Sequence, residues 1–237
     1  MQKISLCITN YNRYEYLFES FAKVVDDERI AEIVIVDDNS DPAIYAKIEE
    51  RCKYIPKVKL YRNDTNIDVY NNKKRSVELA TSKYCIVFDS DNVIDSIYLD
   101  HIYSYQWSNN RILAPDFAQP VFDYTAYAGH TINKSNVRNF TFRKGFDCLF
   151  NTMNYFVHRQ TYLTVWQPKE DIKGADSIYF NYLWLNAGGE IYVVNGLRYF
   201  HRVNDFKSGE HGSNFVKHSV DSTPVCKEIE RLLSKMR

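Results

Sequence analysis

The chain has 237 residues, of which 45% are apolar, and its 30 Lys and Arg residues are balanced by 30 Asp and Glu residues. This length and composition predict one compact domain, and the zero net charge gives no electrostatic reason to expect nucleic acid or an anionic membrane as a partner. No apolar run approaches the roughly 20 residues that cross a bilayer, and the five cysteines show no zinc-binding spacing, so the sequence favours a cytoplasmic protein.

Short apolar runs alternate with helical patterns in the first half of the chain. The apolar runs predict strands at residues 3–9, 31–38, 57–63 and 84–89. The periodic patterns predict helices at residues 13–25, 42–52, 69–80 and 96–107. Apolar strands that alternate with helices indicate a Rossmann-like α/β fold, with a mostly parallel sheet covered by helices on both faces.

The second half of the chain is less regular. We expect two short strands in residues 111–124 around Pro115 and Pro120, a long loop at 125–145 and a strand at 153–159. A helix is expected at 176–189, followed by a hairpin at 190–202 that turns at Asn195-Gly196. The tail, 206–237, is expected to end in a helix over 223–237. Its apolar face packs on the domain or, alternatively, contacts a membrane or partner; it consists of Val225, Ile229, Leu232, Leu233 and Met236.

Polar side chains follow three of the predicted strands at the points where the strands end. They are Thr9, Asn10 and Tyr11, then Asp37, Asp38 and Asn39, and finally Asp89, Ser90 and Asp91. Ligands of parallel α/β sheets bind beyond the carboxyl ends of the strands. A single acidic residue at such a point is often a turn former or a helix cap, but two acidic pairs at one edge predict a ligand site.

The segment FDSDN places the carboxylates of Asp89 and Asp91 one residue apart. Two such groups repel unless a cation lies between them, and Mg²⁺ and Mn²⁺ prefer carboxylate oxygens. The alternative is that Asp91 or Asn92 caps the helix that begins near Asp95. No glycine-rich phosphate loop occurs in the sequence, so a divalent cation is the expected means of neutralising a bound diphosphate.

Four segments together resemble the landmarks of family 2 glycosyltransferases of the GT-A fold. They are ISLCITNYNR (4–13), IVIVDDNSD (33–41), CIVFDSDN (85–92) and GADSIYFNYLWLNAGGEIYVVNGLRYFHR (174–202). The resemblance implies one GT-A domain, with a nucleotide-sugar-binding half to about residue 110 and an acceptor half, containing a smaller β region, at about 111–205. It also implies metal-dependent, inverting transfer of one sugar from a nucleotide-diphosphate sugar, most commonly a UDP-sugar, to a glycan, glycolipid or glycoprotein.

The same resemblance implies roles for the matching residues. The nucleotide would contact Thr9, Tyr11, Asp37, Asp38, Lys73, Asp89 and Ser90. Asp91, helped by Asp89 and His201, would hold Mn²⁺ or Mg²⁺, although a lone histidine at a strand end also suits a structural role. Asp176 would be the general base, with a helix cap as its alternative role. Ala175 stands where inverting members often carry a further acid, which leaves Asp176 as the sole candidate there.

Two other functions stay open at this point. The segment IVFDSDNV resembles the Asp-x-Asp of haloacid-dehalogenase-like phosphohydrolases, in which Asp89 would be the nucleophile and Asp91 the acid/base. That motif normally opens its domain, whereas three strand–helix units precede it in this chain. The second alternative is a catalytically silent GT-A-like module that binds nucleotide sugars, and loss of turnover with retained binding in an Asp176→Asn variant would separate it from an enzyme.

Overall fold

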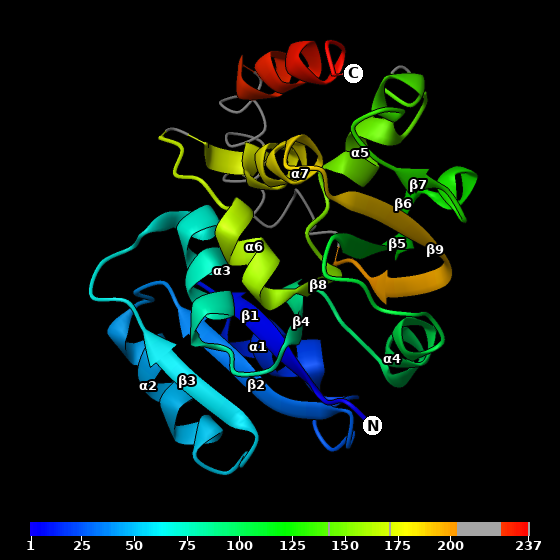
Figure 1. Cartoon of the computed structure of the whole chain (residues 1–237). Coiled ribbons are helices and arrows are strands. Elements are labelled where there is room, and N and C mark those ends of the chain that lie inside the picture. Colours follow the sequence, from blue (N-terminus) through cyan, green and yellow to red (C-terminus); the bar gives the residue numbers. More distant parts are fainter. Residues whose placement is uncertain (142, 171, 203–223, 237) are drawn as a thin grey trace.

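The computed structural model describes residues 1–141, 143–170, 172–202 and 224–236. Within these residues a nine-stranded sheet runs through the molecule in the order β3-β2-β1-β4-β8-β5-β9-β7, with β6 paired to β5. Figure 1 shows the strands of both halves of the chain in this one twisted sheet.

The first half confirms the predicted alternation of strands and helices. Its parallel strands are β1 (Ile4–Asn10), β2 (Ile30–Asp37), β3 (Val58–Arg62) and β4 (Tyr84–Asp89). Its helices are α1 (Tyr14–Phe21), α2 (Pro42–Cys52), α3 (Asp68–Leu79) and α4 (Ser96–Tyr103). Every residue of the central strand β1 is buried, as expected for a strand covered on both faces.

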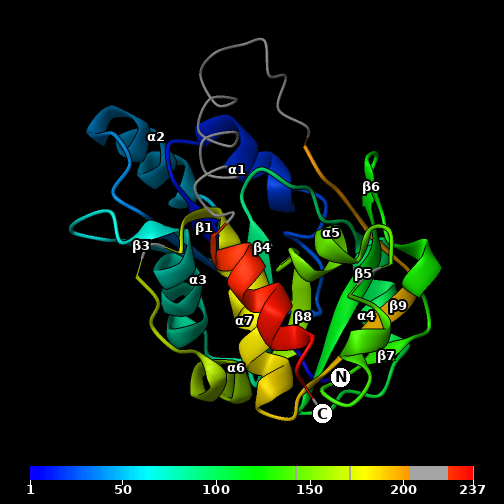
Figure 2. The ribbon, with the colours of Figure 1, turned by 90° about the horizontal axis from the view of Figure 1, so that it is seen from above.

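Helices cover both faces of the parallel strands. Figure 2 shows α1 and α2 on one side of β1, with α3, α6 (Arg159–Val165) and α7 (Asp176–Asn186) on the other. The start of α2 follows local rules, because Asp41 accepts a hydrogen bond from the Ala43 N–H and Pro42 occupies the first turn. Two helices end earlier than predicted, since α1 stops at Phe21 and α4 at Tyr103.

The second half of the chain extends the same sheet. β8 (Tyr155–His158) pairs antiparallel with β4 and with β5 (Arg111–Gln119), and β5 pairs in parallel with β9 (Glu190–Phe200). Because β8 is antiparallel to both of its neighbours, β5 and β9 run in the same direction as β4. Their carboxyl ends therefore lie at the same edge of the sheet as those of β1, β2 and β4.

Several predictions for the second half were wrong. Residues 111–119 form one strand that continues through Pro115, followed by the two-residue β6 (Phe122–Asp123). Residues 190–200 form one strand and not a hairpin: the Asn195-Gly196 pair makes an irregularity, in which the Gly196 N–H donates to Asp116 of β5. Gly196 has φ +81°, a value that suits glycine.

The expected loop at 125–145 is only partly irregular. It contains β7 (Thr131–Ile132), which pairs with β9, and 3₁₀ turns at Thr125–Tyr127 and Val137–Asn139. The short helices α5 (Phe146–Phe150) and α6 were not predicted from the sequence. A further 3₁₀ turn, Lys173–Ala175, leads into α7, which ends at Asn186, before the predicted pair of glycines.

The tail ends in a helix over residues 224–233, and its apolar face packs on the domain as predicted. Ile229, Leu233 and Met236 are buried against the core, and Lys169 forms an ion pair with Glu228 on the helix. The rest of the predicted tail, up to residue 223, lies outside the described residues. Among the helices that the structure describes, none combines the length and apolar character needed to span a membrane.

Candidate active site

The polar strand ends lie side by side at one edge of the sheet, as the sequence predicts. In the register of the strands, Asn10 of β1 is opposite Asp37 of β2, and Thr9 of β1 is opposite Asp89 of β4. Three residues near this edge, Asn12, Asn39 and Asp68, have positive φ angles of 54°, 61° and 73°. Asn and Asp tolerate that conformation better than other non-glycine residues, and such backbone is concentrated at functional sites.

The two adjacent acids at the end of β2 have different surroundings. Asp37 is fully buried and accepts hydrogen bonds from Asn10 Nδ2 (2.8 Å), the Ser40 N–H (2.9 Å) and Ser40 Oγ (2.6 Å). These bonds hold the turn after β2 and leave the carboxylate little capacity for a ligand. Asp37 is therefore placed to support the site and not to line it.

Asp38 is held at the edge through one of its two oxygens. Oδ1 accepts hydrogen bonds from Asn63 Nδ2 at 2.7 Å and from the Ile67 N–H at 2.8 Å, whereas no described residue donates to Oδ2. Tyr11 lies on the neighbouring loop after β1, and 48% of its surface is exposed. A fixed carboxylate beside an open aromatic ring can accept an N–H from a planar heterocycle that stacks on the ring.

Lys73 joins two carboxylates that are far apart in the sequence. Its Nζ lies 3.0 Å from Asp89 Oδ1 and 2.9 Å from Asp176 Oδ2, and only 3% of the residue is exposed. Burial disfavours the charged ammonium, but Asp176 and Asp89 outweigh this effect and raise the pKa of Lys73. The ion pairs therefore bring α3, β4 and α7 together at one point.

Asp89 is held by several partners. Burial raises the pKa of this carboxyl, but Lys73, Arg13 and Asn154 outweigh burial, so the pKa lies below its ordinary value. Asn154, which precedes β8, donates to Asp89 Oδ2 at 3.1 Å and accepts from the Asp89 N–H at 2.9 Å. The Ser90 hydroxyl is buried and has no hydrogen-bond partner among the described residues.

Asp91 and His201 lie on the same side of this edge. Asp91 Oδ2 forms an ion pair with Arg13 at 3.0 Å, and the helix cap is supplied by Asp95 and not by Asp91 or Asn92. Burial lowers the pKa of His201, and the nearby carboxylates of Asp91 and Asp89 offset this only in part. Its Nδ1 is buried and unpaired among the described residues.

Asp176 is the first residue of α7, and its carboxylate points towards Lys73. The helix cap position belongs to Ala175, and no side chain makes a capping hydrogen bond there. Asp176 Oδ2 is the oxygen that contacts Lys73, and 7% of the residue is exposed. The capping role considered from the sequence is therefore wrong, and the carboxylate is placed towards the edge of the sheet.

The sequence reasoning did not single out three residues that contact the candidate site. Arg13 pairs with Asp91, Asn63 with Asp38, and Asn154 with Asp89. Arg13 is the last residue of the segment ISLCITNYNR, so its position just after β1 could have indicated that it lies near the site. Asn63 and Asn154 precede or follow ordinary strands, and only the fold reveals which carboxylates they contact.

The first two thirds of the chain match a known protein family. The model of the family described as "Glycosyl transferase family 2" matches residues 5–163. Abequosyltransferase RfbV of Salmonella typhimurium is 35% identical over 95 residues, covering 38% of this chain and 28% of that protein. An uncharacterized glycosyltransferase of Haemophilus influenzae is 23% identical over 112 residues, covering 47% of this chain and 35% of its own length. The aligned segments thus span about a third of these relatives.

Solved structures share the fold at low identity. Staphylococcus aureus TarS 1–349 in complex with UDP-GlcNAc has a TM-score of 0.67 at 16% identity, covering 98% of this chain and 71% of that one. GalNAc-T7 with UDP, GalNAc and Mn²⁺ has a TM-score of 0.67 at 14% identity, and the match covers 93% of this chain and 48% of that one. The mannosyltransferase PcManGT from Pyrobaculum calidifontis, with GDP-Man and Mn²⁺, has a TM-score of 0.65 at 11% identity, covering 98% and 69%. The chain therefore has the GT-A fold and belongs to glycosyl transferase family 2.

Proposed function

We propose that the protein is an inverting glycosyltransferase that moves one sugar from a nucleotide-diphosphate sugar to a hydroxyl of a glycan, glycolipid or glycoprotein acceptor. The observation that carries the proposal is the contact of Lys73 with both Asp89 and Asp176. Lys73 thus holds together Asp89, which we assign to the donor site, and Asp176, which we assign as the general base. An inverting transfer needs both functions within reach of the same anomeric carbon.

The nucleotide would lie across the ends of β1, β2 and β4. Asp38 Oδ2 would accept an N–H of the base, Tyr11 would stack on the ring, and Thr9 would flank it. Asp89 and Ser90 would face the ribose and the first phosphate, with Lys73 supplying positive charge. We propose UDP as the nucleotide, supported by the UDP-containing complexes among the structural neighbours, while the GDP-Man complex of another neighbour makes GDP the first alternative.

The residues at the edge fit a divalent ion that binds together with the diphosphate. Asp91 and Asp89 offer carboxylate oxygens, and the unpaired, buried Nδ1 of His201 offers an uncharged nitrogen. No group of three or more His, Cys, Asp or Glu side chains in the described part of the chain could hold a metal ion by itself. The remaining ligands would therefore be diphosphate oxygens. Bound there, Mn²⁺ or Mg²⁺ would supply positive charge to the departing nucleoside diphosphate.

Asp176 would act as the general base. Lys73 occupies Oδ2, which leaves Oδ1 to accept the proton of the acceptor hydroxyl as its oxygen attacks the anomeric carbon. The bond from that carbon to the diphosphate breaks on the opposite face, so the configuration inverts. The Lys73 ammonium lies 2.9 Å from Oδ2 and thereby fixes the orientation of the carboxylate.

Removing the base should separate binding from turnover. We expect Asp176→Asn to lower transfer and donor hydrolysis by roughly a hundredfold or more, while the variant still binds UDP with Mn²⁺. Nucleoside diphosphate release measures turnover, and calorimetry measures binding. A variant that keeps full turnover would rule out Asp176 as the base, and a wild-type protein that binds but never turns over would be a silent module.

Metal and nucleotide should stabilise the protein only in combination. In a thermal-shift panel, UDP plus Mn²⁺ should raise the melting temperature, since a ligand at about 100 times its Kd adds about 2.7 kcal/mol. Mn²⁺ alone should have little effect, because the described residues form no complete metal site. Asp91→Ala should abolish the metal-dependent part. Unchanged metal-dependent binding in that variant would contradict the assignment.

The phosphohydrolase alternative receives no support from the fold. Its Asp-x-Asp motif would open the domain, whereas β1, β2 and β3 precede Asp89 here, and the family model that matches residues 5–163 is that of glycosyl transferase family 2. Release of phosphate from simple phosphate esters by the wild-type protein would revive it.

A further inference from the structure

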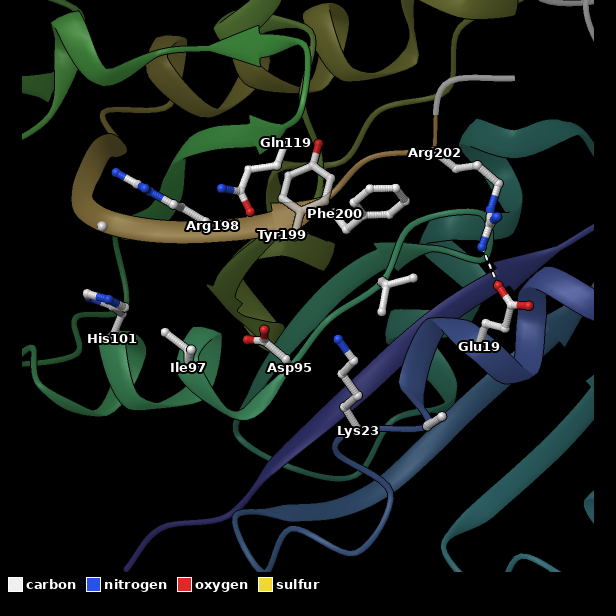
Figure 3. Close-up of a pocket in the computed structure, with 13 residues that line it drawn as sticks. Glu19, Lys23, Asp95, Ile97, His101, Gln119, Arg198, Tyr199, Phe200 and Arg202 are labelled. Atoms are coloured by element: carbon white, nitrogen blue, oxygen red, sulfur yellow. Dashed lines mark hydrogen bonds and ion pairs between the residues drawn. The ribbon is translucent and has the colours of Figure 1, made fainter. Parts of the chain in front are cut away.

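A separate cavity of about 920 Å³ lies between α1, α4 and the end of β9. Figure 3 shows that its lining side chains come from these three elements, from the residues next to α1 and α4, and from Gln119 at the end of β5. None of the residues assigned above to nucleotide, metal or base belongs to this lining. The cavity is nevertheless next to the candidate active site, because Phe200 lines it and His201 is the following residue.

Apolar surface is left open on two sides of the cavity. Phe200, at the end of β9, is 46% exposed, and Ile97, in the first turn of α4, is 58% exposed. Both belong to the few large apolar residues with this much exposed surface in the described part of the chain. An exposed aromatic ring in a concave site is a platform on which the C–H face of a planar or ring-shaped ligand can pack.

Uncommitted polar groups surround this apolar surface. Lys23 and the side chain of Gln119 make no hydrogen bond or ion pair with any described residue and line the cavity (Figure 3). Asp95 accepts the Tyr98 N–H through Oδ1 at 3.2 Å, and no described residue donates to its Oδ2. An ammonium, an amide and a carboxylate oxygen therefore stay available to hydroxyl groups.

The charges of the cavity are balanced. Arg202 pairs with Glu19, and Arg198 lies 3.4 Å from the buried Asp116. Lys23 and Asp95, which both line the cavity, carry opposite charges (Figure 3). A site for a phosphate or another anion would carry a surplus of positive charge. Balanced charge, an open aromatic ring and free donors and acceptors favour a neutral ligand with many hydroxyl groups.

We propose that this cavity binds a neutral saccharide and is a second subsite for the acceptor glycan. The proposal rests on the proposed function and narrows its acceptor to a glycan of more than one sugar. Phe200 is the last residue of β9 and His201 follows it directly. The acceptor would thus pass His201 at the reaction centre and place a more distant sugar on Phe200.

The test follows the Ile97 methyl group by NMR in protein labelled at isoleucine methyls, with the resonance assigned from Ile97→Leu. Maltotetraose, cellotetraose, chitotetraose and mannotetraose are titrated into the millimolar range. At least one of them should shift the Ile97 resonance in a saturable manner. Phe200→Ala and Gln119→Ala should each weaken that binding roughly fivefold to tenfold. Tyr54→Ala is the matched control, because Tyr54 is 77% exposed and lies just after α2, and it should leave binding unchanged.

The proposal is overturned if no oligosaccharide shifts Ile97, or if Phe200→Ala and Gln119→Ala bind as tightly as the Tyr54 variant. Using two lining variants keeps the test valid if one of them fails to fold. Binding of UDP and Mn²⁺ is measured on the same samples. Intact UDP binding without a response at Ile97 refutes only the subsite, whereas a response at Ile97 without binding of UDP or GDP contradicts the proposed donor site and leaves a saccharide-binding cavity.

Discussion

At the scale of single residues, α3 carries three consecutive basic side chains to which the fold gives different surroundings. Lys73 is buried between Asp89 and Asp176, whereas Lys74 lies at the surface, where it pairs with Glu78 and lies over the Trp166 ring. From the sequence, the cluster suits a solvated helix face as well as a phosphate site. Only packing decides that Lys73 turns inward, so its environment could not be predicted from its neighbours.

Lys73→Met should destabilise the protein by about 3–5 kcal/mol, because it leaves the buried carboxylate of Asp176 and the partly buried carboxylate of Asp89 without their cation. Lys74→Met, the matched control on the same helix, should cost less than about 1 kcal/mol, since it removes only a partly exposed pair four residues apart. Urea unfolding followed by circular dichroism measures both. Equal stability of the two variants would contradict the central position given to Lys73.

The site residues themselves were predictable to different degrees. Asp38, Asp89 and Asp91 stand where an apolar run ends, and a parallel sheet brings such ends to one edge, so the sequence places them correctly. The partner of Asp89 is different. Asn154 lies 65 positions further along the chain, and nothing local in its surroundings indicates a contact with β4.

At the scale of elements, β9 illustrates how a local signal is overruled by a partner strand. Asn-Gly between two apolar segments is a strong hairpin signal. Here β5 supplies a long parallel partner on both sides of the pair, and Asp116 Oδ2 accepts the Gly196 N–H at 2.7 Å. Gly196 therefore adopts its positive φ at an irregularity within one strand and does not form a turn between two strands. The local sequence contains no information on Asp116, which is why the hairpin was predicted.

Gly196→Ala should be more destabilising than Gly188→Ala. Both glycines have left-handed backbones, with φ +81° and +87°, so both variants pay the same backbone cost. A Cβ at Gly196 would also lie 2.6 Å from the His101 ring, whereas a Cβ at Gly188 would meet nothing within 4 Å. We expect a further loss of about 1–3 kcal/mol for Gly196→Ala, read from thermal unfolding. Indistinguishable melting curves would show that His101 moves aside freely.

At the scale of the whole molecule, Glu32 ties several parts of the chain together at the edge of the sheet opposite the candidate site. It accepts hydrogen bonds from Ser5 Oγ of β1 and from the N–H and Oγ1 of Thr81, and it pairs with Lys59 of β3. Burial raises the pKa of Glu32, but these partners outweigh burial and lower the pKa to about 2 from its ordinary value of 4.5.

This lowered pKa predicts how stability depends on pH. A carboxyl whose pKa falls on folding stabilises the native state above its unfolded pKa, and the contribution is lost as pH falls through the folded pKa. The wild type should therefore exceed Glu32→Gln in stability near pH 7, and the difference should shrink from about pH 5 towards pH 2. Glu50→Gln, at an exposed pair with Lys53, serves as control. Urea titrations at several pH values measure the difference, and a constant gap for Glu32→Gln would contradict the prediction.

The overall architecture was predictable only in part. Alternation of strands and helices fixed the parallel sheet of the first half, because each connection there is local. The position of β8 was not predictable, since its four residues pair with β4 and β5, which both precede it by many residues. Short strands with distant partners leave no periodic trace in the sequence.

The late arrival of β8 has a consequence for synthesis on the ribosome. β4 is complete at Asp89, but the strand that covers its free side ends only at His158. While the intervening chain is translated, β4, which is almost wholly apolar, has an edge whose backbone groups are unpaired. Unpaired strand edges of this kind promote the aggregation of nascent proteins. Chaperone demand during biosynthesis should therefore be concentrated in that interval and should end when β8 emerges.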